Sequence, residues 1–180
     1  MKKKITILVS SMRSKSNSEM LAEAFRRGAE ESGHTVEWIP LKGKEIRYCS
    51  GCMVCNTTNV CTIQDDAPEI VRKIQQAQVV VFATPIYFYE MAGQMKTMLD
   101  RTTPIFSAEY EFRDVYLLAA AADTDVHAIE GAEKGLQGWI DCFEKASLAG
   151  TVFAGGVTAP GEIEGHEAIQ RAYQIGKAIQ

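Results

Sequence analysis

The first residues able to do chemistry in this chain of 180 residues are four cysteines within one short segment. Cys49, Cys52, Cys55 and Cys61 follow the spacing C-x2-C-x2-C-x5-C. Thiolates this close in sequence commonly share a metal ion or a cluster, or lie beside a redox centre. Four thiolates suit a 4Fe–4S cluster; zinc also accepts four, but structural zinc sites usually pair two separated C-x2-C units. Thiols that only pack the loop are the remaining interpretation. The spacing predicts that the four sulfurs converge.

A second polar group follows the apolar run ITILVSS at 5–11 and reads SSMRSKSNS, from Ser10 to Ser18. It matches neither G-x-G-x-x-G nor G-x-x-x-x-G-K-[ST], so the dinucleotide and NTPase phosphate loops are not supported. It also lacks the C-x5-R of small tyrosine phosphatases. Hydroxyls, an amide and Arg13 just before a helix N-terminus predict a site for a phosphate monoester. An ordinary serine-rich helix cap is the alternative.

A third group, ATPIYFYEM at 83–91, places Pro85, Ile86 and Tyr87 at the end of the most apolar predicted strand. Proline and aromatic faces stack on planar rings, so this loop predicts a wall for a flat cofactor. Phe88 and Tyr89 are instead expected to pack in the core or at a subunit interface. A phosphate at the first loop and a flat ring at this one together indicate FMN.

Strands and helices alternate regularly along the chain, and this alternation is what must position the three groups. Predicted strands cover 5–11, 35–41, 78–85, 115–122 and 150–157. Predicted helices run from Ser18 to a stop at Gly33, from a cap at Asp66 through Ile74, and over 93–101, 135–146 and 167–179. Such alternation predicts one doubly wound α/β domain over 1–180, a parallel sheet with helices on both faces. Ligands are expected at the carboxyl ends of the strands.

Composition narrows the function classes. Hydrophobic residues make up 46% of the chain and charged residues 23%, which is ordinary for a globular domain. A net charge of −4 argues against nucleic-acid and membrane-surface partners. No apolar stretch reaches the length of a membrane span. We therefore expect a cytoplasmic protein whose cysteines are reduced thiols or ligands.

Several other polar residues receive structural interpretations. Cys142 is expected to be a buried small hydrophobe on its helix, and His34 to be solvated. Asp65 and Asp66 are assigned to helix surface and capping. Arg101 is assigned to an exposed helix face or a subunit contact.

Taken together, three motifs resemble the NADPH-dependent FMN reductase family. They are S-S-M-R-x-x-x-N-S, the cysteine segment followed by Asp65-Asp66, and A-T-P-I-Y with downstream G-Q-M-K and D-R. The cysteine segment is similar to that of the iron–sulfur flavoprotein branch. The resemblance spans about the first hundred residues and implies a flavodoxin-like fold, with five parallel strands in the order 2-1-3-4-5. It also implies a homo-oligomer, a dimer or a pair of dimers.

The resemblance assigns residues to each cofactor. The FMN phosphate is implied to lie against Ser11, Arg13, Ser16, Asn17 and Ser18. The flavin ring is implied to rest on Pro85, Ile86 and Tyr87, with a third contact from Ala121, Ala122 and Asp123. The four clustered cysteines are implied to ligate a 4Fe–4S cluster. Because their segment follows the second predicted strand, we expect them near the flavin end of the sheet, with or without a cluster. The family's Gly-Ser-Pro-Arg is Ser10-Ser11-Met12-Arg13 here, so non-glycine residues must adopt the loop's turns.

Two functional hypotheses follow, and no catalytic side chain is assigned in either. The first is an FMN-dependent NAD(P)H oxidoreductase, with NAD(P)H as a transient substrate and a flavin or quinone as the small acceptor. The alternative is an iron–sulfur flavoprotein that carries electrons between protein partners. A zinc-stabilised interaction domain without flavin is a third and weaker interpretation.

Overall fold

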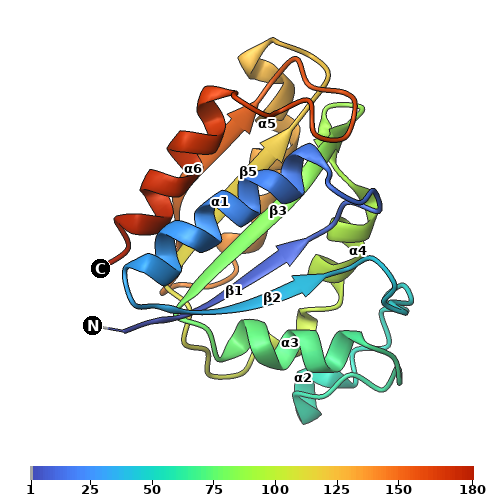
Figure 1. Ribbon diagram of the computed structural model, residues 1–180. Helices are drawn as coiled ribbons and strands as arrows, with labels where there is room; N and C mark the ends of the chain where they lie inside the picture. Colours follow the sequence, from blue (N-terminus) through green and yellow to red (C-terminus); the bar gives the residue numbers. More distant parts are fainter. Residues whose placement is uncertain (1) are drawn as a thin grey trace.

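One mixed sheet organises the computed structural model, which describes residues 2–180 (Figure 1). Its strands are β1 (Lys4–Val9), β2 (Thr35–Pro40), β3 (Val79–Tyr87), β4 (Glu90–Met91), β5 (Asp114–Ala120) and β6 (Ser147–Ala154). Five of them are parallel and run in the order β2-β1-β3-β5-β6, while the short β4 pairs antiparallel with β3. The predicted order 2-1-3-4-5 is therefore confirmed once β4, which was not predicted, is set aside.

Helices cover both faces of this sheet. They are α1 (Asn17–Glu31), α3 (Ala67–Gln75), α4 (Gly93–Asp100), α5 (Glu130–Ile140) and α6 (Glu167–Lys177), with short turns at α2 (Cys55–Thr58), η1 (Thr103–Ile105) and η2 (Val126–Ile129). The buried side chains of α1 and α6 share one core with the sheet, and those of α3, α4 and α5 share another (Figure 1). None of the helices in residues 2–180 has the length and apolar character of a membrane span.

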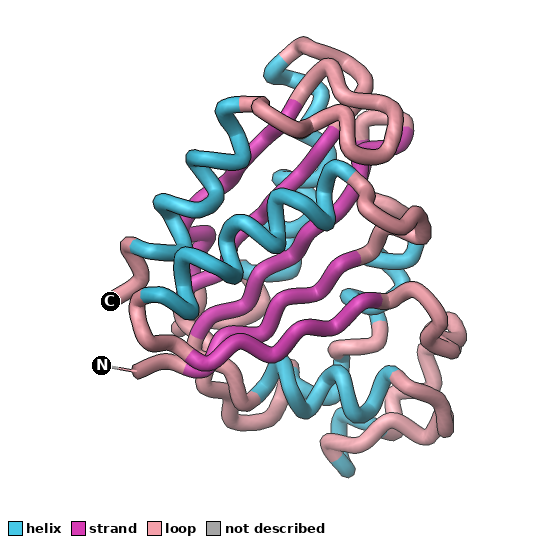
Figure 2. Tube along the Cα trace, viewed as in Figure 1, coloured by secondary structure: helices cyan, strands magenta, loops and turns pink. Residues whose placement is uncertain are grey.

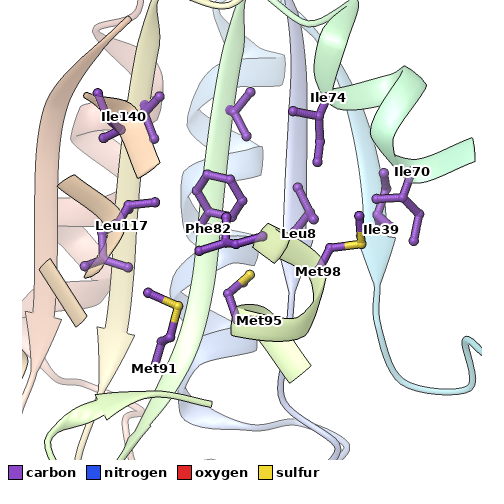
Figure 3. Packing of buried hydrophobic residues seen from close by; sticks show 14 of the residues in the cluster. Leu8, Ile39, Ile70, Ile74, Phe82, Met91, Met95, Met98, Leu117 and Ile140 are labelled. Atoms are coloured by element: carbon purple, nitrogen blue, oxygen red, sulfur yellow. The ribbon is translucent and has the colours of Figure 1, made fainter. Parts of the chain in front are cut away.

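The two cores follow from the alternation of side chains along each strand. On β3, Phe82 faces the core of α3, α4 and α5, while its neighbour Val81 faces that of α1 and α6. Figure 3 shows Met95 of α4 next to Phe82, and Met98 of the same helix between Leu8 and Ile39. Because both faces are covered, the central strands β1, β3 and β5 are largely apolar, which is why they could be recognised in the sequence.

Helices α1 and α6 approach each other closely, because glycines stand at their contact. A Cβ on Gly28 would lie 2.1 Å from the carbonyl oxygen of Tyr173, and one on Gly176 would lie 2.1 Å from that of Phe25. No side chain fits at either position. Helix α6 thereby braces α1, whose N-terminus points to the carboxyl edge of the sheet.

The predicted helix at 135–146 is misplaced by about one and a half turns. Asp125 accepts a hydrogen bond from the backbone N–H of His127 at 2.9 Å, which starts η2, and η2 runs directly into α5. Helix α5 then ends at Ile140. Cys142 lies beyond that end and is exposed, so its assignment as a buried hydrophobe was wrong.

His34 is also placed differently from the expectation, because it is buried at 7% exposure. Its Nδ1 accepts a hydrogen bond from the backbone N–H of Lys3 at 3.1 Å, and its Nε2 lies 2.9 Å from the carbonyl oxygen of Ile179. An accepting Nδ1 requires the proton on Nε2, which donates to that carbonyl. His34 therefore joins segments from both ends of the chain and is not solvated.

Candidate cofactor sites

The loop after β1 leads into the N-terminus of α1, where two backbone N–H donors have no partner. Ser16 caps α1: its Oγ accepts from the N–H of Glu19 at 3.2 Å, and the Glu19 carboxylate accepts from the N–H of Ser16 at 3.3 Å. The N–H of Met20 bonds to the Ser16 carbonyl. In residues 2–180, the N–H groups of Asn17 and Ser18 have no protein acceptor. Two donors therefore remain for a ligand at the positive end of the helix.

Two side chains of this loop bind the segment after β6. Arg13 donates from Nη1 to the carbonyl of Thr158 at 2.6 Å. The Asn17 amide donates to the carbonyl of Ala159 at 3.0 Å and accepts from the N–H of Ile163 at 3.2 Å. The side chain of Asn17 thus organises the loops, and its backbone N–H is the group left for a ligand. The loop itself needs a left-handed φ only at Lys15, at 53°.

Backbone hydrogen bonds join the loops at the carboxyl edge. The N–H of Ser10 donates to Ala83 of β3 at 2.9 Å. The N–H of Ala121 donates to Ala154 of β6 at 2.9 Å, and Val157 donates back to Ala121 at 2.9 Å. Figure 2 shows the loops that follow the strands gathered at this end of the sheet. Backbone bonds of the sheet therefore hold this edge together, in addition to the side chains of Arg13 and Asn17.

These loops enclose a cavity of about 150 Å³. Its lining includes ten of the eleven residues predicted to bind FMN: Ser11, Arg13, Ser16, Asn17, Ser18, Pro85, Ile86, Tyr87, Ala121 and Ala122. Ala120, Val157 and Thr158 also line it and were not predicted. Thr158 could have been found, since it follows the fifth predicted strand at the same edge.

Asp123, the remaining predicted contact, does not line the cavity. Its carboxylate accepts from the hydroxyl of Tyr89 at 3.1 Å and from the N–H of Asp125 at 2.9 Å. The hydrogen bond from Asp125, followed by that from Tyr89, lowers the pKa of Asp123. Asp123 therefore holds the β3–β4 turn in place.

That turn has an unusual backbone and surface. Phe88 and Tyr89 are its central residues, and both have left-handed φ values, 51° and 63°. Bulky residues adopt this conformation only at a cost of order 1–2 kcal/mol each. Phe88 is fully exposed at 101% and Tyr89 at 61%, so the expectation that they pack in the core of this chain was wrong. The turn projects aromatic rings beside Tyr87, which lines the cavity.

The four clustered cysteines line a second, narrower cavity of about 50 Å³. Cys55 is buried, Cys61 is intermediate, and Cys49 and Cys52 are exposed. All four therefore line one cavity, while their convergence on a single centre stays a prediction. In residues 2–180, however, no three His, Cys, Asp or Glu side chains are arranged around a single ion-sized point.

The thiols of this cavity affect one another electrostatically. Burial raises the pKa of Cys55, and the negative charge on Cys61 raises it further. Cys52 has a lowered pKa, because the backbone of Val54 and the side chain of Thr62 hydrogen-bond to its sulfur. The cavity thus contains sulfurs in unlike environments that are close enough to interact.

Beside the cysteines lies a buried ion pair that the sequence interpretation missed. Arg101, 1% exposed, donates from Nη1 to Asp65 Oδ2 at 2.6 Å and from Nη2 to Asp65 Oδ1 at 2.9 Å. Burial acts to raise the pKa of Asp65, but hydrogen bonds from Arg101 and from the N–H groups of Arg47 and Ala67 outweigh it and hold the pKa at about 2. Arg101 is therefore not on an exposed face, and Asp65 is not a surface carboxylate.

Asp66 departs from its expected capping role. It precedes α3, but its side chain makes no capping bond to that helix. It accepts instead from the N–H of Glu45 at 2.7 Å, while Asp65 accepts from the N–H of Ala67 at 3.0 Å. Asp65, and not Asp66, therefore accepts a hydrogen bond from the first residue of α3.

The donor set of the second cavity fits an iron–sulfur cluster. Four thiols line it, and so does a cation, Arg101, whose Nε has no hydrogen-bond partner. A cluster held by four thiolates is net negative, so a buried cation complements it. This cavity lies at the C-terminal end of α4, whereas the N-terminus of α4 adjoins β3. It shares no lining residue with the first cavity, and about 12 Å of helix separates the two ends. The proximity of the thiols to the flavin end of the sheet stays a prediction.

Five parallel strands in this order define the flavodoxin-like class of α/β proteins. The first cavity lies at the carboxyl edge of these strands, where proteins of this class bind their ligands. Residues 3–139 match the family described as NADPH-dependent FMN reductase. The chain belongs to this family and is an oxidoreductase.

Relatives add detail to this placement. An iron–sulfur flavoprotein of Archaeoglobus fulgidus is 29% identical over 174 residues, which is 96% of this chain and 76% of that protein. An iron–sulfur flavoprotein of Methanocaldococcus jannaschii is 31% identical over 102 residues, 57% of this chain and 53% of that protein. Among solved structures, an NAD(P)H:quinone oxidoreductase from Methanothermobacter marburgensis superposes with a TM-score of 0.77 at 19% identity, covering 98% of this chain and 96% of that one. The last likeness concerns the fold alone.

Proposed function

We propose that this protein uses FMN to move electrons from NAD(P)H to a small acceptor such as a flavin or a quinone. The observation that carries the proposal is the first cavity. Unpaired N–H groups of Asn17 and Ser18, serine hydroxyls and Arg13 meet there at a helix N-terminus, opposite Pro85. This combination suits a phosphate joined to a planar ring.

The phosphate would bind to the N–H groups of Asn17 and Ser18 and to the side chains of Ser11, Ser16 and Arg13. The ring would lie against Pro85, Ile86 and Tyr87, with the alanines after β5 on its other side. Pockets that enclose whole ligands usually exceed about 300 Å³. The cavity's 150 Å³ therefore supports a partly exposed ligand, with room for a nicotinamide or an acceptor beside the half-exposed Tyr87.

The chemistry that FMN supplies when bound is hydride acceptance and release of electrons together or singly. No carboxylate, imidazole or thiol from residues 2–180 lines the cavity. The contribution of the protein is therefore to place the cofactor, to stack on its ring and to leave one face open.

An anaerobic titration tests this function. We expect NADPH or NADH to bleach the visible absorption of the purified, FMN-loaded protein, and a quinone to restore it. A protein that binds FMN but is reduced only by a protein donor would favour the electron carrier instead.

The second candidate function is that of an iron–sulfur flavoprotein, with Cys49, Cys52, Cys55 and Cys61 holding a 4Fe–4S cluster. It is favoured by four thiols that line one cavity together with a buried cation. Such a cluster would take electrons from the flavin and deliver them to a partner. In anaerobically prepared protein, Cys52→Ser should abolish the iron–sulfur charge-transfer absorption while FMN stays bound. An unchanged spectrum would assign the thiols to packing.

We further propose a homodimer or homotetramer in the cytoplasm. The exposed aromatic turn of Phe88 and Tyr89 supports contact with a second copy, and five free cysteines suit a reducing compartment. Sedimentation of wild-type protein and of Phe88→Ser tests the first point, with a smaller assembly expected for the variant. A wild-type monomer would contradict it.

A further inference from the structure

Arg101 contacts the cysteine segment at more points than its pairing with Asp65 requires. Its Nη1 also donates to the carbonyl of Arg47 at 2.7 Å, and its Nη2 to the carbonyl of Ile63 at 3.4 Å. The same Nη2 donates to the sulfur of Cys61 at 3.5 Å. One guanidinium thus touches the segment before the first cysteine, the last cysteine itself and the residues that follow it.

The surroundings of the guanidinium are incomplete. Its side chain is fully buried, as is that of Asp65, and its Nε has no partner. Donors of an arginine buried this deeply are normally all satisfied, because an unpaired buried polar group is costly. Arg101 also lines the cavity that the four cysteines share. The sulfur contact therefore joins the guanidinium to the wall of the cavity where the cluster would bind.

Stability alone does not account for the pair. A buried ion pair can often be replaced by apolar side chains without loss of stability. The cysteine segment, by contrast, has only one helical turn, α2, and left-handed backbone at Gly51, Met53 and Asn59. Regular structure does not fix where its sulfurs point. The guanidinium supplies fixed points of attachment that the segment itself lacks.

We propose that Arg101 is a positioning residue of the cluster site, which holds Cys61 as the fourth ligand through its N–H···S contact and sets the reduction potential through that hydrogen bond. The inference rests on the cluster of the proposed function and adds to it a determinant outside the four ligands. Asp65 offsets the charge of the guanidinium, but the N–H···S hydrogen bond favours the reduced state of the cluster, because reduction adds negative charge to its sulfurs. Arg101 therefore raises the midpoint potential.

The test compares Arg101→Gln, Arg101→Lys and a matched control, Lys96→Gln, after anaerobic reconstitution with iron and sulfide. Lys96 lies on the same helix, but its side chain is 58% exposed and pairs with Asp100 at the surface. We expect Arg101→Gln to lose iron to a chelator roughly 10-fold faster or more, and its remaining cluster to have a lower midpoint potential. Arg101→Lys keeps the charge without the planar fork, so it should lose iron faster with a smaller potential shift. Lys96→Gln should match wild type in both.

Bound FMN, measured on the same samples, reports whether the sheet is folded. If Arg101→Gln does not retain FMN, the test rests on Arg101→Lys. Iron retention equal to wild type in Arg101→Lys would then overturn the positioning role of Arg101. Wild-type retention and potential in a folded Arg101→Gln would overturn it directly and leave the cluster standing. A wild-type protein that binds FMN but takes up no iron or sulfide would overturn the cluster and the role of Arg101 together.

Discussion

The cofactor cavity and the cysteine segment lie at opposite ends of α4 and are positioned in opposite ways. The cavity at the carboxyl edge is assembled by strands β1, β3, β5 and β6, whose loops are joined by backbone hydrogen bonds. The cysteine segment has a single helical turn and is anchored by a buried charge pair, Arg101 with Asp65. One site is supported by many weak contacts, and the other depends strongly on one.

This difference predicts how each region responds to damage. Loss of one side chain at the carboxyl edge leaves the sheet and most of the ligand contacts in place, so its effects should be small and local. Loss of either partner of the charge pair leaves a buried, uncompensated charge, so its effects should be large. The predictions below test that contrast, from the largest effect to the smallest.

The largest effect is expected for Asp65→Ala, which leaves the guanidinium of Arg101 buried without its counter-ion. We expect a loss of about 3–5 kcal/mol in the free energy of unfolding, measured by urea denaturation. Asp66→Ala is the matched control. The carboxylate of Asp66 is adjacent in sequence, but it is 36% exposed and bonds mainly to the N–H of Glu45. That variant should lose only about 1 kcal/mol. Equal losses in the two variants would remove the special role of the charge pair.

The same carboxylate should give the protein a characteristic acid sensitivity. The folded pKa of Asp65 is about 2, below its ordinary value of 3.8. A lowered folded pKa contributes stability above the unfolded value, and this contribution is lost as pH falls from about 4 towards 2. We expect about 2 kcal/mol from this residue, measured as the difference between the pH profiles of wild type and Asp65→Asn. Parallel profiles would contradict the assignment.

A smaller effect is expected at the phosphate end of the carboxyl edge. The double variant Asn17→Ala with Ser18→Ala removes the Ser18 hydroxyl and the amide that ties this loop to the segment after β6, but it keeps the two backbone donors, so FMN should weaken by roughly tenfold. Riboflavin, which lacks the phosphate, should weaken much less. Titration of both ligands by flavin fluorescence measures the difference. Equal weakening would show that these residues do not face the phosphate.

The smallest effect is expected for Tyr87→Ala, because Tyr87 is 51% exposed and the ring wall retains Pro85 and Ile86. The free energy of unfolding should change by less than about 1 kcal/mol. The absorption envelope of bound flavin, or its rate of reduction by NADPH, should nevertheless change, because a stacking face is lost. An unchanged spectrum with unchanged kinetics would limit Tyr87 to a structural role.

The same contrast explains which features could be predicted from the sequence. Parallel strands end at one edge, so loops that end predicted strands had to meet, and ten of eleven assigned residues line one cavity. Asp65 and Arg101 are 36 residues apart, and nothing in the local pattern around either shows that they pair. Both fitted an exposed helix surface equally well. Burial of a charge depends on the tertiary partner, and periodicity does not carry that information.

The start of α5 and the short strand β4 could not be predicted for a related reason. Asp125 caps η2, which leads directly into α5, and α5 has no side-chain cap of its own. The close contact of Gly131 with Tyr89 then fixes α5 against the aromatic turn, because a Cβ on Gly131 would lie 2.2 Å from the Tyr89 carbonyl oxygen. The short β4 exists because the chain reverses at that turn. Neither feature follows from apolar spacing.

The aromatic turn also has a consequence for laboratory evolution. Two successive left-handed positions are best filled by Asn and Gly, so Phe88→Asn with Tyr89→Gly should relieve backbone strain. A selection for heat resistance alone would enrich such variants and remove the exposed rings beside the cavity. One library of these two positions can be sorted separately for resistance to heat unfolding and for NADPH turnover, and the two selections should enrich different variants. Enrichment of the same variants would mean that the strained turn brings no benefit to the activity.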